Sequence, residues 1–259
     1  MSERARSVLA PAALLVALLL AWELAARWDV LADLLSVRDY LVPAPSEIAE
    51  ALWEERRLLA EDAWVTFREV LAGFALAAVA GVALAVLMHL SPLARGALYP
   101  LLVASQTVPI VVLAPVFVVW FGFGIVPKLL IIALICFFPI AVNTYDGLRS
   151  VDPELTKMMR TLGADRRRIL SDAELPWSLP YIFSGAKVAV AVAVIGAVFA
   201  EWAGADSGLG HLILVSSGEL STALTFAAIF VLSLMAIALF ALLALLERRV
   251  VDWKEDPAR

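Results

Sequence analysis

Residues 145–179 of the chain read YDGLRSVDPELTKMMRTLGADRRRILSDAELPWSL. This stretch is polar, and long apolar runs lie on both sides of it. Its first half predicts a short helix, because Asp152 can cap the first turn, Pro153 takes the first helical position and Gly163 provides a stop. We therefore expect a helix of about ten residues, roughly 15 Å long, between membrane segments.

Apolar residues recur along this helix at the spacing i, i+3, i+4 and i+7, which places them on one face. They are Leu155, Met158, Met159 and Leu162. An apolar face on an otherwise polar helix predicts that something covers it. Beyond Gly163 the chain passes through three arginines to Leu175-Pro176, where we expect the helical path to break.

The rest of the chain has the composition of an integral membrane protein. Apolar residues make up 63% of its 259 residues, and the mean hydropathy is +0.90. Six runs are long enough to cross a hydrocarbon core, which takes about 20 residues. They cover residues 8–26, 70–90, 98–121, 127–144, 181–202 and 224–246. Because these runs are continuous rather than alternating, we expect an all-α fold with about six transmembrane helices, in one domain over residues 1–259.

Basic residues predict the orientation of these helices. If the N-terminus is inside, thirteen of the 20 Lys and Arg residues lie on the inner side and six on the outer side. Both termini and the polar stretch are therefore expected in the cytoplasm.

The first run follows Arg4 and Arg6, as in a secretory signal, but no clean cleavage site follows it, so we interpret it as a retained anchor.

Small residues at four-residue spacing in two runs predict close helix packing. The second run has Gly73, Ala77, Gly81 and Ala85, and the fifth has Gly185, Ala189, Ala193, Ala197 and Ala200. The spacing leaves open whether this packing is within one chain or between two. Lys187, near the start of the fifth run, is expected to extend to the lipid headgroups.

Polar residues inside the third and fourth runs are candidates for a translocation path. Gln106 and Thr107 precede Pro109, and Asn143 lies near the end of the fourth run. Such groups are tolerated at membrane depth where they face protein or water. The alternative is that they form hydrogen bonds between helices.

The polar stretch resembles the cytoplasmic coupling segment of ABC importer permeases, whose motif is EAA, three residues, G, nine residues, I, one residue and LP. Gly163, Leu175 and Pro176 stand at the matching positions. Lys157, Met158 and Met159 replace the triplet, and Ala173 replaces the isoleucine. The resemblance implies a type I ABC importer permease fold with a cytoplasmic coupling helix, a core of about residues 64–246 and a coupling segment at 145–179.

The wider resemblance is to permeases of the nitrate, sulfonate and taurine type. Three stretches, VPIVVLAPVFVVWFGFG, FFPIAVNTYDGL and ELPWSLPYIFSGAK, are most similar to the branch associated with thiamine pyrimidine precursors and riboflavin. A permease of this branch would carry a small polar organic solute, with sulfonate, taurine or nitrate as the alternative.

The resemblance also implies partners and a place in the cell. It implies a bacterial inner membrane, a second permease copy, an extracytoplasmic solute-binding protein, surrounding lipid, and cytoplasmic ATPase subunits that hold ATP and Mg. The residues expected to couple to the ATPase are Asp152, Leu155, Met158, Met159, Leu162, Gly163, Ala164, Leu175 and Pro176.

The chain lacks the motifs of an enzyme. It has no phosphate-binding G-x-x-x-x-G-K-[ST] loop, no G-x-S-x-G and no H-E-x-x-H. With one cysteine, Cys136, and two histidines, no metal cluster is expected. We therefore expect no catalytic residue, no metal, no cofactor on this chain and no nucleic-acid partner.

A stand-alone secondary transporter is the other functional class, but it would need ionisable groups at the membrane midplane.

Overall fold

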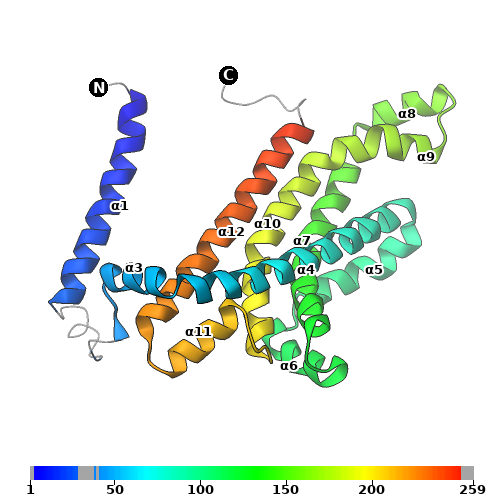
Figure 1. The fold of residues 1–259 in the computed structure, drawn as a ribbon. Coiled ribbons are helices and arrows are strands. Elements are labelled where there is room, and N and C mark those ends of the chain that lie inside the picture. The colour runs from blue at the N-terminus through cyan, green and yellow to red at the C-terminus, as the bar shows by residue number, and fades with distance from the viewer. Residues whose placement is uncertain (1–2, 29–37, 39–40, 252–259) are drawn as a thin grey trace. The chain divides into compact units, whose positions relative to one another are not determined.

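The computed structural model describes residues 3–28, 38 and 41–251, with side chains from residue 13 onward. Within these residues the chain is helical and has no strand (Figure 1). The elements are α1 (Glu3–Arg27), α3 (Pro45–Glu54), α4 (Arg56–Leu90), α5 (Pro92–Ser105), α6 (Ile110–Phe121), α7 (Ile125–Arg149), α8 (Pro153–Thr161), α9 (Arg166–Ile169), the π-helix η2 (Leu170–Glu174), α10 (Leu175–Trp202), α11 (Leu209–Gly218) and α12 (Thr222–Val250).

The chain forms two compact units. One consists of residues 1–64 and 207–232, and the other of residues 65–206 and 233–259. The second unit contains α5 to α10 and most of α4 and α12, so it holds the whole predicted coupling segment.

Among the described residues, four helical segments are long and apolar enough to cross a membrane: α4, α7, the continuous path from Arg166 to Trp202, and α12. The count becomes five if α5 and α6 together form one span. The first expected run, residues 8–26, lies in α1, and the side chains of its first part fall outside the described residues. An all-helical membrane fold is confirmed.

The third run does not form the single helix that its length predicts. It forms α5 and α6, whose axes are bent by 102°. Pro109 stands before α6 and lacks the N–H that would continue α5. At the end of α5, the hydroxyls of Ser105 and Thr107 donate to the carbonyls of Leu102 and Ala104, at 2.7 and 2.8 Å, so local bonds replace the lost helical ones.

Helix α7 is the centre of the second unit, because α4 and α10 both approach it at glycines. A Cβ at Gly73 would lie 2.6 Å from the Ile132 side chain of α7, and one at Gly185 would lie 2.6 Å from the Pro139 carbonyl oxygen. The two small-residue stripes therefore serve packing within one chain. This settles the alternative that the spacing alone left open.

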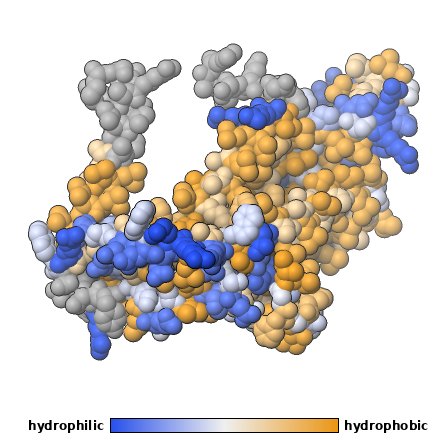
Figure 2. Space-filling model, in the orientation of Figure 1, coloured by the Kyte–Doolittle hydropathy of each residue, from blue (hydrophilic) through white to orange (hydrophobic). Residues whose placement is uncertain are grey.

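The contacts of α7 continue along its length. At one end, Ile131 packs with Ala114 and Ala200, and toward the other, Tyr145 and Leu148 pack with residues of α4 and α5. In Figure 2, hydrophilic residues gather over α8 and α9 and at the end of α12, whereas the helical surface below them is mostly hydrophobic. This distribution suits a bundle with one end in water and its length surrounded by lipid.

In the first unit, a carboxylate joins α1 to α3. Glu23 accepts hydrogen bonds from the backbone N–H and the hydroxyl of Ser46, at 3.0 and 2.8 Å. Farther along the chain, Asp62 accepts a hydrogen bond of 2.8 Å from the backbone N–H of Gly208, at the start of α11. These bonds anchor helix starts, which otherwise leave N–H groups unsatisfied.

Replacing Gly185 by Val should destabilise the second unit by at least about 1–3 kcal/mol, because the added Cβ meets a backbone oxygen that cannot rotate away. Thermal unfolding of the purified chain in detergent would measure this. Gly218→Ala is the control, since nothing lies within 4 Å of a Cβ at Gly218. Equal stability of the two variants would contradict this account of α7.

Candidate functional site

The N-terminus of α8 is closed by side chains, as the sequence predicts. The carboxylate of Asp152 accepts a hydrogen bond of 2.8 Å from the backbone N–H of Glu154, and Pro153 is the first helical residue. Glu154 adds an acidic group to the first turn, which favours the positive end of the helix dipole.

The C-terminus of α8 is a Schellman motif centred on Gly163. Gly163 has a φ of +87°, its N–H donates to Arg160, and the N–H of Ala164 donates to Met159, at 3.0 and 2.9 Å. Only glycine adopts this backbone conformation without strain. Both ends of α8 are therefore fixed by residues of this chain.

The apolar face of α8 has little cover in a single chain. Leu162 is 79% exposed and Met158 is 52% exposed, whereas Leu155 and Met159 are half-buried. No residue of α8 is buried. A helix that ends in water with exposed Leu and Met side chains has the features of a docking element.

The chain returns from α8 to the membrane without the break that Leu175-Pro176 predicts. Asp165 caps α9 by accepting from the Arg168 N–H at 2.8 Å, η2 follows, and α10 begins at Leu175. The wider π turn stands where a proline in an α-helix would clash with the carbonyl four residues earlier. The expected break is thus replaced by a continuous helical path from Arg166 to Trp202.

A buried carboxylate ties this segment to the end of α4. One oxygen of Glu174 lies 2.9 Å from His89 Nε2 and 2.6 Å from Arg166 Nη1. The Glu174 side chain is only 7% exposed. Arg166 lies eight residues from Glu174 in the sequence and His89 lies 85 residues away, so the bond to His89 joins two distant segments.

The second unit contains further buried charged groups that the sequence did not reveal. Lys128 Nζ lies 2.7 Å from a Glu69 oxygen, and the Thr66 hydroxyl donates to Glu201 at 2.7 Å. Lys187 pairs with Glu247, in the last turn of α12, at 2.7 Å, and its expected reach to the lipid headgroups stays a prediction. Lys128 and Glu201 lie near helix ends, and their partners hold α4 to α7 and to α10.

The candidate path residues are not brought together by a bond. Gln106 and Thr107 are exposed at the bend between α5 and α6. Asn143 is half-buried in α7 and donates to the Pro139 carbonyl of its own helix at 2.7 Å. Within the described part of the chain, the Asn143 side chain therefore forms no hydrogen bond to another helix. The role of Asn143 in a translocation path stays a prediction.

Comparison with known proteins places the chain among transport proteins. Residues 77–252 match the family described as the binding-protein-dependent transport system inner membrane component. A formylaminopyrimidine transport permease of Halalkalibacterium halodurans is 36% identical over 98% of this chain and 99% of its own length. A riboflavin transport system permease of Chloroflexus aurantiacus is 42% identical over 61% of this chain and 59% of its own length.

A solved structure shares the fold. The MetNI methionine ABC transporter, in an inward-facing conformation, contains a chain that superposes with a TM-score of 0.67. The match covers 76% of this chain and 98% of the other, at 18% sequence identity. At this identity the similarity concerns the fold alone.

Replacing Glu174 by Ala should lower the stability of the second unit by about 1–3 kcal/mol, because His89 and Arg166 lose their shared acceptor and water reaches only part of the site. Asp172→Ala is the matched control. Asp172 pairs with Arg168 at 3.7 Å in the open, and such pairs contribute about 0–1 kcal/mol. Thermal unfolding in detergent would compare them, and an equal loss in both would show that Glu174 joins nothing essential.

Proposed function

Because the chain belongs to the family of binding-protein-dependent transport system inner membrane components, we propose that it carries a formylaminopyrimidine, or a closely related aminopyrimidine, across the membrane. The chain is a permease subunit of an ABC importer and crosses the membrane several times. The proposed solute is supported by the relative that matches almost the whole of both chains. Riboflavin is the second candidate, because the riboflavin permease is 42% identical to this chain over the aligned residues. It comes second because the alignment covers only 61% of this chain.

We propose α8 as the element that docks on the ATPase. The observation that carries this proposal is the exposed apolar face of a helix whose two ends are already capped. An amphipathic helix of this kind fits an apolar groove, and flexible methionines such as Met158 and Met159 adapt to the groove surface. Leu175 and Pro176 would carry the movement of α8 into α10.

The same proposal assigns the remaining components of the importer. A second copy of this chain would complete the path, and a binding protein would deliver the solute from the outer side. ATP and Mg would be held by the ATPase subunits and no cofactor by this chain. Both termini would lie in the cytoplasm of a bacterial cell, on the same side as α8.

In this mechanism the permease passes the movement of the ATPase subunits on to its own membrane helices. When ATP draws the two ATPase subunits together, each would move the α8 helix that it holds. The continuous path from Arg166 to Trp202 would then tilt α10, and the two permease chains would open alternately to the two sides. Gln106, Thr107 and Asn143 are the proposed path residues.

Leu162→Asp should reduce ATP-driven uptake at least about tenfold while the chain stays folded, because Leu162 is 79% exposed and the new charge would enter only the ATPase groove. Lys157→Glu is the control, since it adds an acid to the polar face, where the motif has glutamate. Uptake by proteoliposomes and the amount of ATPase that co-purifies are the measurements. Normal uptake by Leu162→Asp would refute the docking role of α8.

The solute is tested with the assembly purified from its native membrane together with its binding protein. Proteoliposomes that contain ATP should accumulate labelled formylaminopyrimidine, and unlabelled formylaminopyrimidine should compete better than riboflavin or taurine. Uptake should stop without ATP and should persist when the proton gradient is collapsed. Uptake of taurine or riboflavin alone would reject the pyrimidine assignment but leave the importer function intact.

A further inference from the structure

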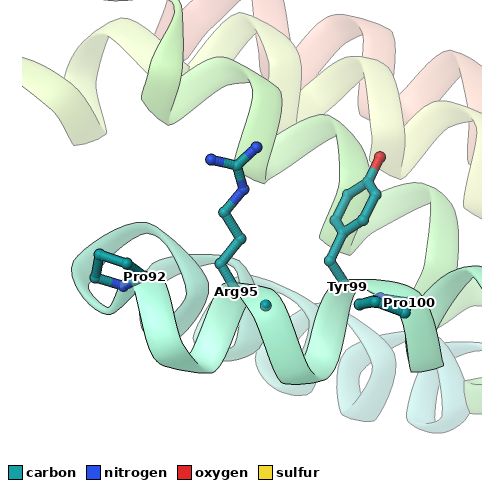
Figure 3. Close-up of a pocket in the computed structure, with 5 residues that line it drawn as sticks. Pro92, Arg95, Tyr99 and Pro100 are labelled. Atoms are coloured by element: carbon teal, nitrogen blue, oxygen red, sulfur yellow. The ribbon is translucent and has the colours of Figure 1, made fainter.

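A pocket of about 360 Å³ lies on α5, near the end of α7 that leads into α8 (Figure 3). It is lined by Pro92, Arg95, Gly96, Tyr99 and Pro100. Arg95 and Tyr99 are one helical turn apart, and both extend from α5 toward α7 (Figure 3). A pocket of this size is large enough for a small ligand or for the headgroup of a lipid.

The side chains of Arg95, Tyr99 and Arg149 all lie near the ring of Tyr145 on α7. Tyr145 is only 3% exposed. The guanidinium carbons of Arg95 and Arg149 lie 5.8 and 5.5 Å from the centre of this ring. The ring of Tyr99 lies 6.0 Å from it, tilted by 49°. Two cations from two helices are thus held beside one aromatic ring.

These groups have unused hydrogen-bond donors. Within the described residues, Arg95 and Arg149 form no ion pair, and neither the Tyr99 nor the Tyr145 hydroxyl forms a hydrogen bond. Each guanidinium carries five N–H donors and no acceptor, and each phenol adds an O–H. Two guanidinium groups beside one ring bring like charges into the same region, and an anion that binds there would offset them.

We propose that Arg95, Tyr99, Tyr145 and Arg149 form a binding site for a phosphate group. A phosphate offers several acceptor oxygens and so can be reached by donors from both α5 and α7, whereas a carboxylate offers two. Basic pockets between transmembrane helices bind the headgroups of anionic lipids. An exposed apolar side chain on α5 also fits a lipid, since Leu93, next to the pocket residue Pro92, is 84% exposed.

The position of the site connects it with coupling. Arg149 is the last residue of α7, and Asp152, the cap of α8, follows three residues later. A bound phosphate would hold the ends of α5 and α7 together at the base of α8. The proposal does not depend on which solute is carried, so the two can fail separately.

Binding is tested on the full chain, purified with the subunits that accompany it. The chain is placed in nanodiscs of phosphatidylcholine alone or of phosphatidylcholine and phosphatidylglycerol in equal parts, and retained phosphatidylglycerol is counted by native mass spectrometry. Inorganic phosphate is titrated separately in the phosphatidylcholine discs, with thermal unfolding as the readout. The first arm detects a lipid phosphate and the second a soluble one.

Three variants make the test specific. The double variant Arg95→Gln and Arg149→Gln removes both cations. Gly96→Leu places an apolar side chain at the pocket, and nothing lies within 4 Å of its Cβ. Arg249→Gln removes an exposed arginine at the end of α12, away from the pocket residues, and is the control.

The double variant and Gly96→Leu should each reduce binding about tenfold, the loss expected for charge-assisted hydrogen bonds, while Arg249→Gln binds as the unaltered chain does. Loss of phosphatidylglycerol retention identifies a lipid as the source of the phosphate. Loss of stabilisation by inorganic phosphate identifies a soluble ligand. Unchanged binding in both arms, or an equal loss in Arg249→Gln, overturns the proposal.

Discussion

The close approach of α4 and α10 to α7 is the constraint on which the second unit depends. Lipid tails are as apolar as leucine side chains, so helices in a membrane gain little from simple burial and associate through tight van der Waals contact instead. Gly73 and Gly185 allow that contact with Ile132 and with the Pro139 carbonyl. Buried polar pairs such as Glu69 with Lys128 then fix how the start of α7 lies against α4. Because only three residues separate α7 from α8, the packing of α7 also determines where α8 begins.

The connection from α8 back into the membrane is stiffer than a loop. Helical turns run without interruption from Arg166 to Trp202, and η2 accommodates the proline within them. Glu174, the residue just before α10, lies in this path and contacts His89 near the end of α4. The start of α10 is therefore joined to the end of α4. A displacement of α8 would thus reach two helices of the bundle rather than be absorbed by a flexible turn.

Local signals were the part of the fold that could be predicted from the sequence. Asp152, Pro153 and Gly163 act on their immediate neighbours, and the helix they predict is present. The third run was misjudged because hydropathy does not register how Ser105 and Thr107 bond back to carbonyls before Pro109. The link from His89 to Glu174 and the pair of Glu69 and Lys128 join residues 85 and 59 positions apart, and no spacing rule in one sequence reveals such contacts. The docking and path roles of the named residues remain predictions.

The capped ends of α8 have a consequence for the thermodynamics of assembly. A segment that folds only on its partner loses backbone entropy during binding, and this loss weakens the complex and adds to its heat-capacity change. With Asp152 at one end and Gly163 at the other, α8 is ordered before any partner binds, so the proposed docking would not have to supply that entropy. Its association would resemble the docking of two rigid bodies, governed mainly by the area of the Leu and Met side chains that is removed from water.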